Sequence, residues 1–283
     1  MERAFRSMRR NVYQLLKPIR KSLLNIDILE IGSESLPKVS IVVPVLNESE
    51  NIKPLLSELR SALATISAFG IFEIIYVDDG SVDTTYEVLK SESEAFPELV
   101  IIRHKFVLGQ SAAIRTGVIR ARAPLIVTID GDGQNDPADI PKLLAAYFNL
   151  QNSEFLMIAG HRAQRRDVWV KRFSSRIANS VRSIFLGDET PDTGCGLKIF
   201  SREAFLSMPA FDHMHRFLPA LMIGLGGRVI SIKVNHRSRE RGQSNYGVFD
   251  RLFVGVIDLF GVLWLKRRAL RASNISKKES SED

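Results

Sequence analysis

Two aspartates separated by one residue, together with a nearby amide, are the side chains in this sequence best suited to chemistry. Asp130, Asp132 and Gln134 stand together in the stretch VTIDGDGQNDP at 127–137. Carboxylate and amide oxygens on one side of a tight turn suit Mg²⁺ or Mn²⁺. An ion held by so few protein oxygens keeps open positions, and there it can neutralise the charge that builds on a departing diphosphate. The stretch therefore predicts a divalent metal site.

The residues around the two aspartates indicate how they are positioned. The apolar and β-branched run at 125–129 is typical of a buried parallel strand, and Gly131 and Gly133 allow the backbone to turn sharply at its end. The carboxylates are thus expected at the carboxyl end of a strand. The alternative is that they form an acidic turn that only caps the helix after Pro137.

Strand and helix patterns alternate along the first half of the chain. This alternation predicts an α/β fold of the Rossmann-like kind, with a mostly parallel sheet covered by helices on both faces. Ligands bind such sheets beyond the carboxyl ends of the strands. The expected strands are Val39 to Val45, Phe72 to Val77, Leu99 to Arg103, Leu125 to Ile129, Leu156 to Gly160 and, later, Val229 to Val234.

Polar clusters follow two further strands, at 44–48 (PVLNE) and at 78–83 (DDGSVD). Because the carboxyl ends of parallel strands meet at one edge, we expect these clusters to lie near the acidic turn. Each can instead cap its own helix, Asp83 especially. The small residues from Gly109 to Gly117 predict another helix start, whose amides either face an anion or pack on the sheet.

Length and composition limit the class of protein. With 283 residues and 45% hydrophobic content, one large domain with appendages is expected. A net charge of +7 leaves nucleic acid, anionic lipid or a phosphorylated substrate as partners, and the usual nucleic-acid-binding motifs are absent from the sequence. The only cysteine, Cys195, excludes an intrachain disulfide and is interpreted as a packing residue. No signal peptide is predicted.

Cations gather in the second half of the chain. The segment 236–247 holds Arg237, Arg239 and Arg241 at alternate positions between glycines, and it is interpreted as a mobile phosphate clamp or else as a charged surface loop. A cluster between Arg162 and Arg176 has the same two interpretations. Three other residues stay open: Asp192 is expected to orient a sugar hydroxyl or a backbone group, and His215 and Arg216 to meet a ligand or cap a partner.

Both ends of the chain are expected to contact a membrane surface. Residues 1–24 fit a basic amphipathic helix that lies on anionic lipid or packs on protein. The apolar run 252–265 has 14 residues, which as a helix rise about 21 Å, too short to span a bilayer. With Trp264 and a basic cluster at its end, it is predicted to be an interfacial or membrane-dipping helix. The tail at 273–283 is polar and predicted to be disordered.

The ordered motifs resemble the inverting nucleotide-sugar glycosyltransferases of the A-type fold. IVVPVLNE at 41–48, VDDGSVD at 77–83 and the DGD turn are shared by many such enzymes. DTGCGLKIF at 192–200 and RERGQSNYG at 239–247 are similar to the narrower branch of polyprenyl-phosphate sugar synthases, which includes dolichol-phosphate mannose synthases. The resemblance implies a catalytic domain at 38–247, between a membrane-surface segment and linker at 1–37, an interfacial helix at 248–268 and a tail at 269–283.

The resemblance also implies roles for individual residues. Asp130, Asp132 and Gln134 match the metal-binding turn. Arg239 matches a contact to a donor or acceptor phosphate, and Arg172 is the best match for an acceptor-phosphate arginine. The positions that match nucleotide contacts are Pro44, Leu46, Glu48, Val77, Asp79, Ile129, Gly131, Arg241 and Asn245.

The chain departs from the pattern of its presumed relatives at two of these positions. Asn245 stands where many of them have Lys, so a cation is missing unless Arg241 or Arg237 replaces it. Leu46 stands where Tyr is common, which puts base stacking at that position in doubt.

The implied reaction is the metal-assisted transfer of a sugar, with mannose the first guess, from a GDP- or UDP-sugar to a polyprenyl phosphate with inversion. A phosphate monoester is already largely a dianion at neutral pH, so this acceptor needs no strong general base. The enzyme would work as a peripheral or monotopic protein on the cytoplasmic face of a membrane. Alternatives are a hydroxyl acceptor on a polysaccharide or glycolipid, a non-catalytic nucleotide-sugar-binding scaffold, and a nucleotidyltransferase.

Overall fold

The computed structural model describes residues 36–65, 71–150, 155–162, 187, 190–238 and 248–268. Within them, seven strands form one sheet in the order β3-β2-β1-β4-β6-β5-β7. All neighbouring strands are parallel except β6, which runs antiparallel to β4 and to β5. The strands are β1 (Val39–Val45), β2 (Phe72–Asp78), β3 (Leu99–Arg103), β4 (Leu125–Thr128), β5 (Leu156–Arg162), β6 (Lys198–Ser201) and β7 (Arg228–Val234).

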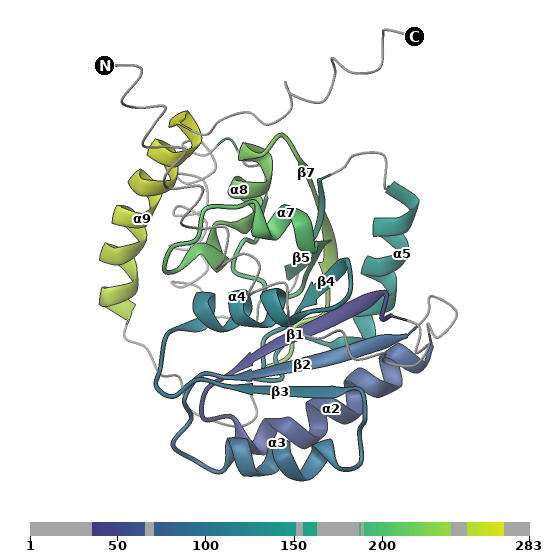
Figure 1. The fold of residues 1–283 in the computed structure, drawn as a ribbon. Coiled ribbons are helices and arrows are strands. Elements are labelled where there is room, and N and C mark those ends of the chain that lie inside the picture. The colour runs from purple at the N-terminus through teal and green to yellow at the C-terminus, as the bar shows by residue number, and fades with distance from the viewer. Residues whose placement is uncertain are drawn as a thin grey trace, which may run out of the picture. The chain divides into compact units, whose positions relative to one another are not determined.

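Helices cover both faces of this sheet (Figure 1). One face carries α2 (Ser49–Ala64), α3 (Thr85–Ser93) and, after the short turn η2 (Pro137–Asp139), α5 (Ile140–Leu150). The other carries α4 (Gln110–Arg120), α7 (Arg202–Leu206), η3 (Met214–Arg216), α8 (Leu218–Gly224) and α9 (Val248–Arg268). The expected α/β fold with a mostly parallel sheet is confirmed.

The core consists of two apolar layers, one on each side of the sheet. Along β1, Ile41 and Val43 join the layer under α2 and α5, whereas Val42 between them joins the layer under α4 and α8. All three side chains are fully buried. This alternation explains why the strand is a continuous apolar run in the sequence, since both of its faces are covered.

The expected strands are found within two residues of their predicted ends, but β6 was not expected. This strand has only four residues, and it begins with Lys198, a residue type that is rarely buried. The strand lies between β4 and β5 and reverses the direction of the chain there. It therefore brings the segment before it, 192–197, to the same edge as the acidic turn.

The last helix is longer than its apolar run suggested. Helix α9 has 21 residues, not 14, because it extends beyond both ends of 252–265. Val262 is buried against the core, while Ile257, Phe260 and Trp264 are 57%, 63% and 60% exposed. Within the described residues, no helix combines the length and apolar character needed to cross a bilayer. The predicted surface helix at 1–24 lies outside the described residues.

Candidate active site

The two central aspartates lie where expected, in the turn that follows β4. Asp130 accepts a hydrogen bond from Gln110 Nε2 at 2.9 Å, at the start of α4. Asp132 Oδ1 accepts the backbone N–H of Gln134 at 3.1 Å, which closes the turn. Ile129 is buried, and its N–H donates to the carbonyl of Val42, so the turn starts from a fixed point on the sheet.

The carboxylates of Asp130 and Asp132 repel each other. Burial, and then the charge of Asp132, raise the pKa of Asp130 to about 6, although Lys198, Arg162 and Gln110 act in the opposite direction. The ionised form of Asp130 is thus disfavoured, and more positive charge beside it would stabilise that form. A divalent cation supplies that charge, and the oxygens of two carboxylates fit a hard ion.

Few protein side chains would coordinate such an ion. Among the described residues no group of three His, Cys, Asp or Glu side chains is placed to hold a metal. Two carboxylates, with the amide of Gln134 as the expected third ligand, therefore leave coordination positions for a ligand.

The segment 192–197 forms a wall against Asp130. A side-chain carbon on Gly196 would overlap the Asp130 carboxylate, so any larger residue here would displace that carboxylate. The Gly196 carbonyl accepts from Thr128 Oγ1 at 2.7 Å, and the ammonium of Lys198 binds the carbonyl of Cys195. Cys195 itself is fully buried in the core, which confirms its packing role.

A buried group of opposite charges lies beside this wall. The Arg162 guanidinium donates to both oxygens of Asp192, at 2.7 and 2.8 Å, and its backbone N–H donates to the same carboxylate at 3.2 Å. Asp192 thus orients an arginine and its backbone. Lys198 is only 3% exposed, and burial lowers the pKa of its ammonium although Cys195, Asp130 and Asp192 favour the charged form.

The strand ends of β1 and β2 adjoin the acidic turn. Pro44 and Val77 lie opposite each other in the β1–β2 register. A side-chain carbon on Gly131 would lie 2.9 Å from the Pro44 carbonyl oxygen, so the turn packs directly on the end of β1. Glu48 is 9% exposed and accepts from Asn51 Nδ2 at 2.6 Å, and Leu46 is half-buried. Pro44, Leu46, Glu48 and Val77, which are expected at a nucleotide, thus lie at the ends of β1 and β2.

Asp79 has a different environment from Asp130. It is 3% exposed, and its two oxygens accept the backbone N–H groups of Leu108 and Gly109 at 3.0 and 2.8 Å. His104 Nδ1 lies 2.7 Å from the same carboxylate. Asp79 therefore positions the loop between β3 and α4.

Asp83 caps the start of α3, as the alternative interpretation had it. Its Oδ1 accepts the backbone N–H of Thr85 at 3.0 Å, and its Oδ2 accepts that of Ser49 at 3.4 Å.

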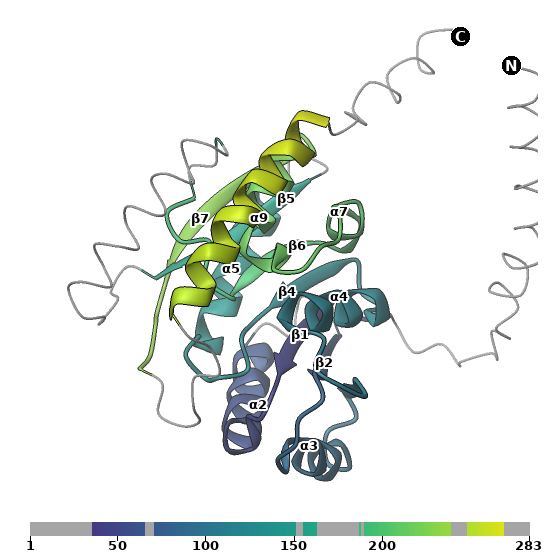
Figure 2. The ribbon, with the colours of Figure 1, turned by 90° about the vertical axis from the view of Figure 1, so that its left-hand side faces the viewer.

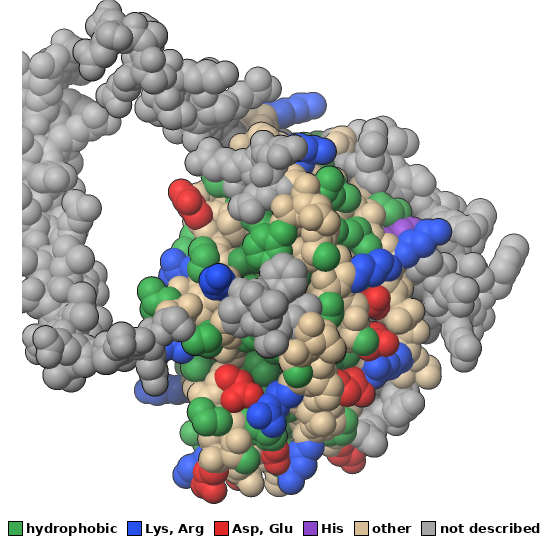
Figure 3. All heavy atoms as spheres, turned by 90° about the vertical axis from the view of Figure 1, so that its right-hand side faces the viewer, with side chains coloured by type: hydrophobic (Ala, Val, Ile, Leu, Met, Phe, Trp, Pro, Cys, Tyr) green, Lys and Arg blue, Asp and Glu red, His purple; other side chains and the backbone are tan. Residues whose placement is uncertain are grey.

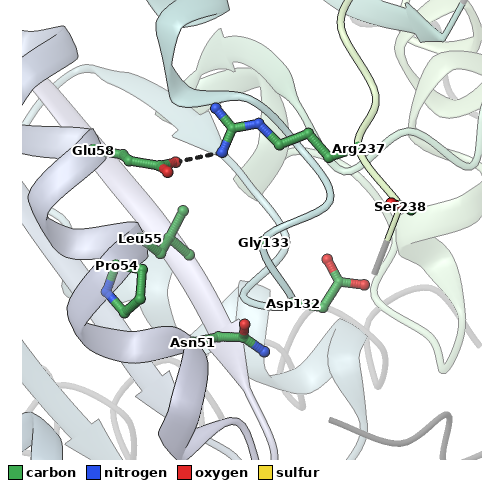
Figure 4. Close-up of a pocket in the computed structure, with 8 residues that line it drawn as sticks. All are labelled: Asn51, Pro54, Leu55, Glu58, Asp132, Gly133, Arg237 and Ser238. Atoms are coloured by element: carbon green, nitrogen blue, oxygen red, sulfur yellow. Dashed lines mark hydrogen bonds and ion pairs between the residues drawn. The ribbon is translucent and has the colours of Figure 1, made fainter. Parts of the chain in front are cut away.

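A pocket opens between α2 and the acidic turn. Figure 4 shows Arg237 reaching from the segment after β7 over the turn toward Glu58. Arg237 binds Glu58 and Asp136 at 2.8 Å each, so its guanidinium already has two carboxylate partners. The pocket is lined by Asn51, Pro54, Leu55, Glu58, Asp132, Gly133, Arg237 and Ser238.

Comparison with known proteins identifies the family. The profile described as Glycosyl transferase family 2 matches residues 40–207. The chain is 35% identical over 238 residues to a dodecaprenyl-phosphate galacturonate synthase of Rhizobium johnstonii, covering 83% of this chain and 69% of the relative. This chain belongs to glycosyl transferase family 2.

A second relative has a related name. The chain is 32% identical, over 84% of its length and 70% of the relative, to an undecaprenyl-phosphate 4-deoxy-4-formamido-L-arabinose transferase of Edwardsiella ictaluri. Two further relatives of that name are covered over 64% and 63% of their length, so the chain spans slightly less than two thirds of them. The resemblance to polyprenyl-phosphate sugar synthases is confirmed.

Solved structures agree on the fold of this glycosyltransferase. Glucosyl-3-phosphoglycerate synthase of Mycobacterium tuberculosis, in complex with Mn²⁺ and UDP-glucose, matches with a TM-score of 0.58 at 18% identity over 81% of this chain and 79% of that one. A mannosyltransferase of Pyrobaculum calidifontis, in complex with GDP-mannose and Mn²⁺, matches with a TM-score of 0.58 at 19% identity over 85% and 67%. The A-type glycosyltransferase fold is therefore confirmed.

His215 of the glycosyltransferase packs at the start of α4. Its backbone N–H donates to Ser111 Oγ at 3.2 Å, and its Nδ1 lies 2.7 Å from the same oxygen. Burial, with the charges of Arg216, Lys198 and His213, lowers the pKa of His215 to about 3. With its pKa lowered this far, the imidazole is neutral at pH 7. His215 thus contacts α4 within the protein, and the expected contact of His215 with a ligand or a partner stays a prediction.

Several site residues emerged only from the fold. Gln110 and Lys198 approach Asp130 from α4 and β6, and neither was singled out in the sequence. The helix start predicted near the strand edge could have pointed to Gln110. No sequence feature could have pointed to Lys198, because β6 was not expected. Four expected phosphate or nucleotide contacts, namely Arg172, Arg239, Arg241 and Asn245, lie outside the described residues.

Proposed function

We propose that this glycosyltransferase moves a sugar from a nucleoside-diphosphate sugar to a polyprenyl phosphate, with inversion at the anomeric carbon and the help of a divalent cation. The names of the two relatives described above support the acceptor, because each contains a polyprenyl phosphate. The two solved complexes with Mn²⁺ and a nucleotide sugar support the donor class and the ion.

One observation carries the proposal: two acids follow β4 at the strand edge of a family 2 fold, and burial together with the charge of Asp132 raises the pKa of Asp130 although Lys198 and Arg162 act in the opposite direction. Acids that only capped a helix would resemble Asp83, whose oxygens accept backbone N–H groups of two helix starts.

Asp130, Asp132 and Gln134 are the residues that would hold Mg²⁺ or Mn²⁺. When bound, such an ion neutralises charge on the leaving diphosphate. The chain itself keeps the two carboxylates in place. Gln110 fixes one oxygen of Asp130, the backbone of Gln134 fixes one oxygen of Asp132, and Gly196 closes the opposite side. Pro44, Val77 and Glu48 are proposed to contact the nucleotide at the adjoining strand ends, with Leu46, Asp79, Ile129 and Gly131.

The acceptor requires cations more than it requires a base. Its phosphate is largely dianionic at neutral pH, so no proton has to be removed before it attacks the anomeric carbon. A single displacement inverts that carbon. Arg172 and Arg239 are proposed to hold this phosphate. Arg237 can join them only by leaving Glu58 and Asp136, its present partners.

A lipid acceptor places the enzyme on a membrane surface. Helix α9 offers three exposed apolar side chains, Ile257, Phe260 and Trp264, and ends in Lys266, Arg267 and Arg268. Such a helix fits the boundary between headgroups and acyl chains of an anionic leaflet. We propose peripheral attachment to the cytoplasmic face, through α9 and the segment 1–24.

A transfer assay tests this function. The protein is incubated with Mn²⁺, a short-chain polyprenyl phosphate in detergent, and a panel of GDP-mannose, UDP-glucose and UDP-galacturonate. The panel is needed because mannose is only a guess and the relatives' names contain other sugars. We expect one donor to give a lipid-linked sugar whose anomeric configuration is inverted. A lack of transfer from a donor that stabilises the protein would contradict the proposal.

The main rival function uses a hydroxyl acceptor and needs a general base near the donor sugar. Asp192 belongs to the same segment as Gly196, which packs against Asp130, but both oxygens of Asp192 bind Arg162. This pairing favours the phosphate acceptor. In the same assay, simple sugars and glycolipids without phosphate should give no product. A non-catalytic scaffold would bind a donor but would form no product with any acceptor.

A further inference from the structure

Four apolar side chains are exposed together on two neighbouring loops. Val82, in the loop between β2 and α3, is 92% exposed. Phe106, Val107 and Leu108, in the loop between β3 and α4, are 66%, 52% and 47% exposed. The two loops touch, since a side-chain carbon on Gly80 would lie 2.8 Å from the backbone of Phe106. We refer to these four residues as the loop patch.

The protein fixes the backbone beneath the loop patch. Leu108 donates its N–H to the buried carboxylate of Asp79, and Val82 donates its N–H to Asn47 Oδ1 at 2.9 Å. An exposed apolar cluster on a fixed backbone is unfavourable in water and typically marks a contact surface.

The loop patch lies on the side of the molecule where α9 lies. Figures 1 and 2 show α9 and the β3–α4 loop on the side to which the carboxyl ends of β1, β2 and β3 point. Two contacts join them. A side-chain carbon on Gly109 would lie 3.5 Å from Asp212, and the next residue, His213, binds Asp258 in the middle of α9 at 3.1 Å.

The charges beside these apolar side chains suit an anionic surface. Lys105 is exposed next to the loop patch, and Arg267 and Arg268 are exposed at the end of α9. One exposed acid, Asp212, stands between the two regions and lies 3.7 Å from His213. In contrast, acidic and basic side chains are interspersed on the face seen in Figure 3.

We infer that the loop patch is a second membrane contact, which enters an anionic phospholipid leaflet together with the exposed face of α9. This inference rests on the proposed function and adds to it a contact close to the site. Gln110, two residues after Leu108, binds Asp130. Insertion of the patch would therefore hold the acidic turn near the headgroup plane, where the phosphate of a polyprenyl lipid lies.

A fluorescent probe tests this contact directly. Val107→Cys is labelled with an environment-sensitive dye, which is selective because Cys195 is fully buried. Vesicles of phosphatidylcholine with added phosphatidylglycerol should shift the emission to the blue, and bromine-labelled lipids should quench it. Phe148→Cys, on α5 on the other side of the molecule, is the matched control and should not respond.

A second measurement gives the size of the effect. Phe106→Ser should weaken binding to the same vesicles about tenfold, since a buried phenyl group is lost. Phe148→Ser, which replaces an aromatic ring that is 40% exposed, should leave binding unchanged. Equal binding of the two variants would overturn the inference.

The outcomes separate this inference from the proposed function. If a dye at Phe260→Cys on α9 enters the lipid but the dye at 107 does not, the inference fails and membrane attachment through α9 stands. If UDP or GDP without vesicles shifts the dye at 107, the patch contacts a nucleotide and the inference fails. Sugar transfer to a short-chain acceptor in detergent tests the chemistry independently of either result.

Discussion

Two pairs of aspartates at the ends of two strands have opposite surroundings. After β2, Asp78 and Asp79 are 0% and 3% exposed, and protein groups bind their carboxylates. After β4, burial and then the negative charge of Asp132 raise the pKa of Asp130. Similar sequence therefore builds a loop support in one place and the proposed cation site in the other. The difference lies in how many hydrogen-bond donors the fold brings to each pair.

The largest effect is expected from removing the second acid of the β4 pair. Asp132→Ala should lower the rate of sugar transfer roughly a thousandfold or more, because the leaving diphosphate loses its charge partner. Circular dichroism and the urea midpoint should stay as in the wild type. Asp83→Asn, an acid that caps a helix, is the matched control and should keep most of the activity. Metal-dependent activity in Asp132→Ala would refute the assignment.

The β2 pair should respond in stability. Asp79→Ala leaves the N–H groups of Leu108 and Gly109 without their acceptor, which should cost about 3 kcal/mol of unfolding free energy. Urea denaturation measures this free energy. Asp79→Asn should lose less of it than Asp79→Ala, because the amide keeps one acceptor oxygen. A loss below about 1 kcal/mol would mean that the loop does not depend on this carboxylate.

The neutral imidazole near the β4 pair predicts a pH effect. The pKa of His215 is about 3 in the fold against its ordinary value of 6.5, so the unfolded chain binds more protons below pH 6.5. Stability is therefore retained above that pH and lost as the pH falls, by up to about 2 kcal/mol between pH 7 and 5. His215→Gln should lose correspondingly less over that range. Parallel denaturation curves at both pH values would contradict this.

The smallest expected effect is on stability, and it tests most directly how the β4 pair differs from the β2 pair. In the absence of metal, Asp130→Asn should raise unfolding stability by about 1 kcal/mol, because it removes a repelled and half-buried charge. The same variant should lose the increase in melting temperature that Mn²⁺ gives the wild type. If the variant is less stable than the metal-free wild type, or if Mn²⁺ raises its melting temperature as much as that of the wild type, the charge of Asp130 does not have the proposed effect.

The sequence predicted those parts of the site that follow from local pattern. Apolar runs ending in polar clusters located β1, β2 and β4, and the turn at 130–134 was placed at a strand end. It did not reveal that Asp79 accepts the N–H groups of Leu108 and Gly109, because these donors come from a distant segment.

Strand β6 escaped prediction for a related reason. The four residues of β6, which include the buried Lys198, have no strand periodicity of their own, and the strand exists only because β4 and β5 flank it. Gln110 and Arg162 were likewise visible as residues, but their contacts with Asp130 and Asp192 required the fold.

The late position of β6 in the chain has a consequence for biosynthesis. The acidic turn emerges from the ribosome long before residues 192–201, which supply its wall and join β4 to β5. A nascent chain that ends before this segment carries both aspartates but lacks the Gly196 backbone beside them. Donor binding is therefore expected to begin only when most of the polypeptide has been made, so unfinished chains would not sequester nucleotide sugars.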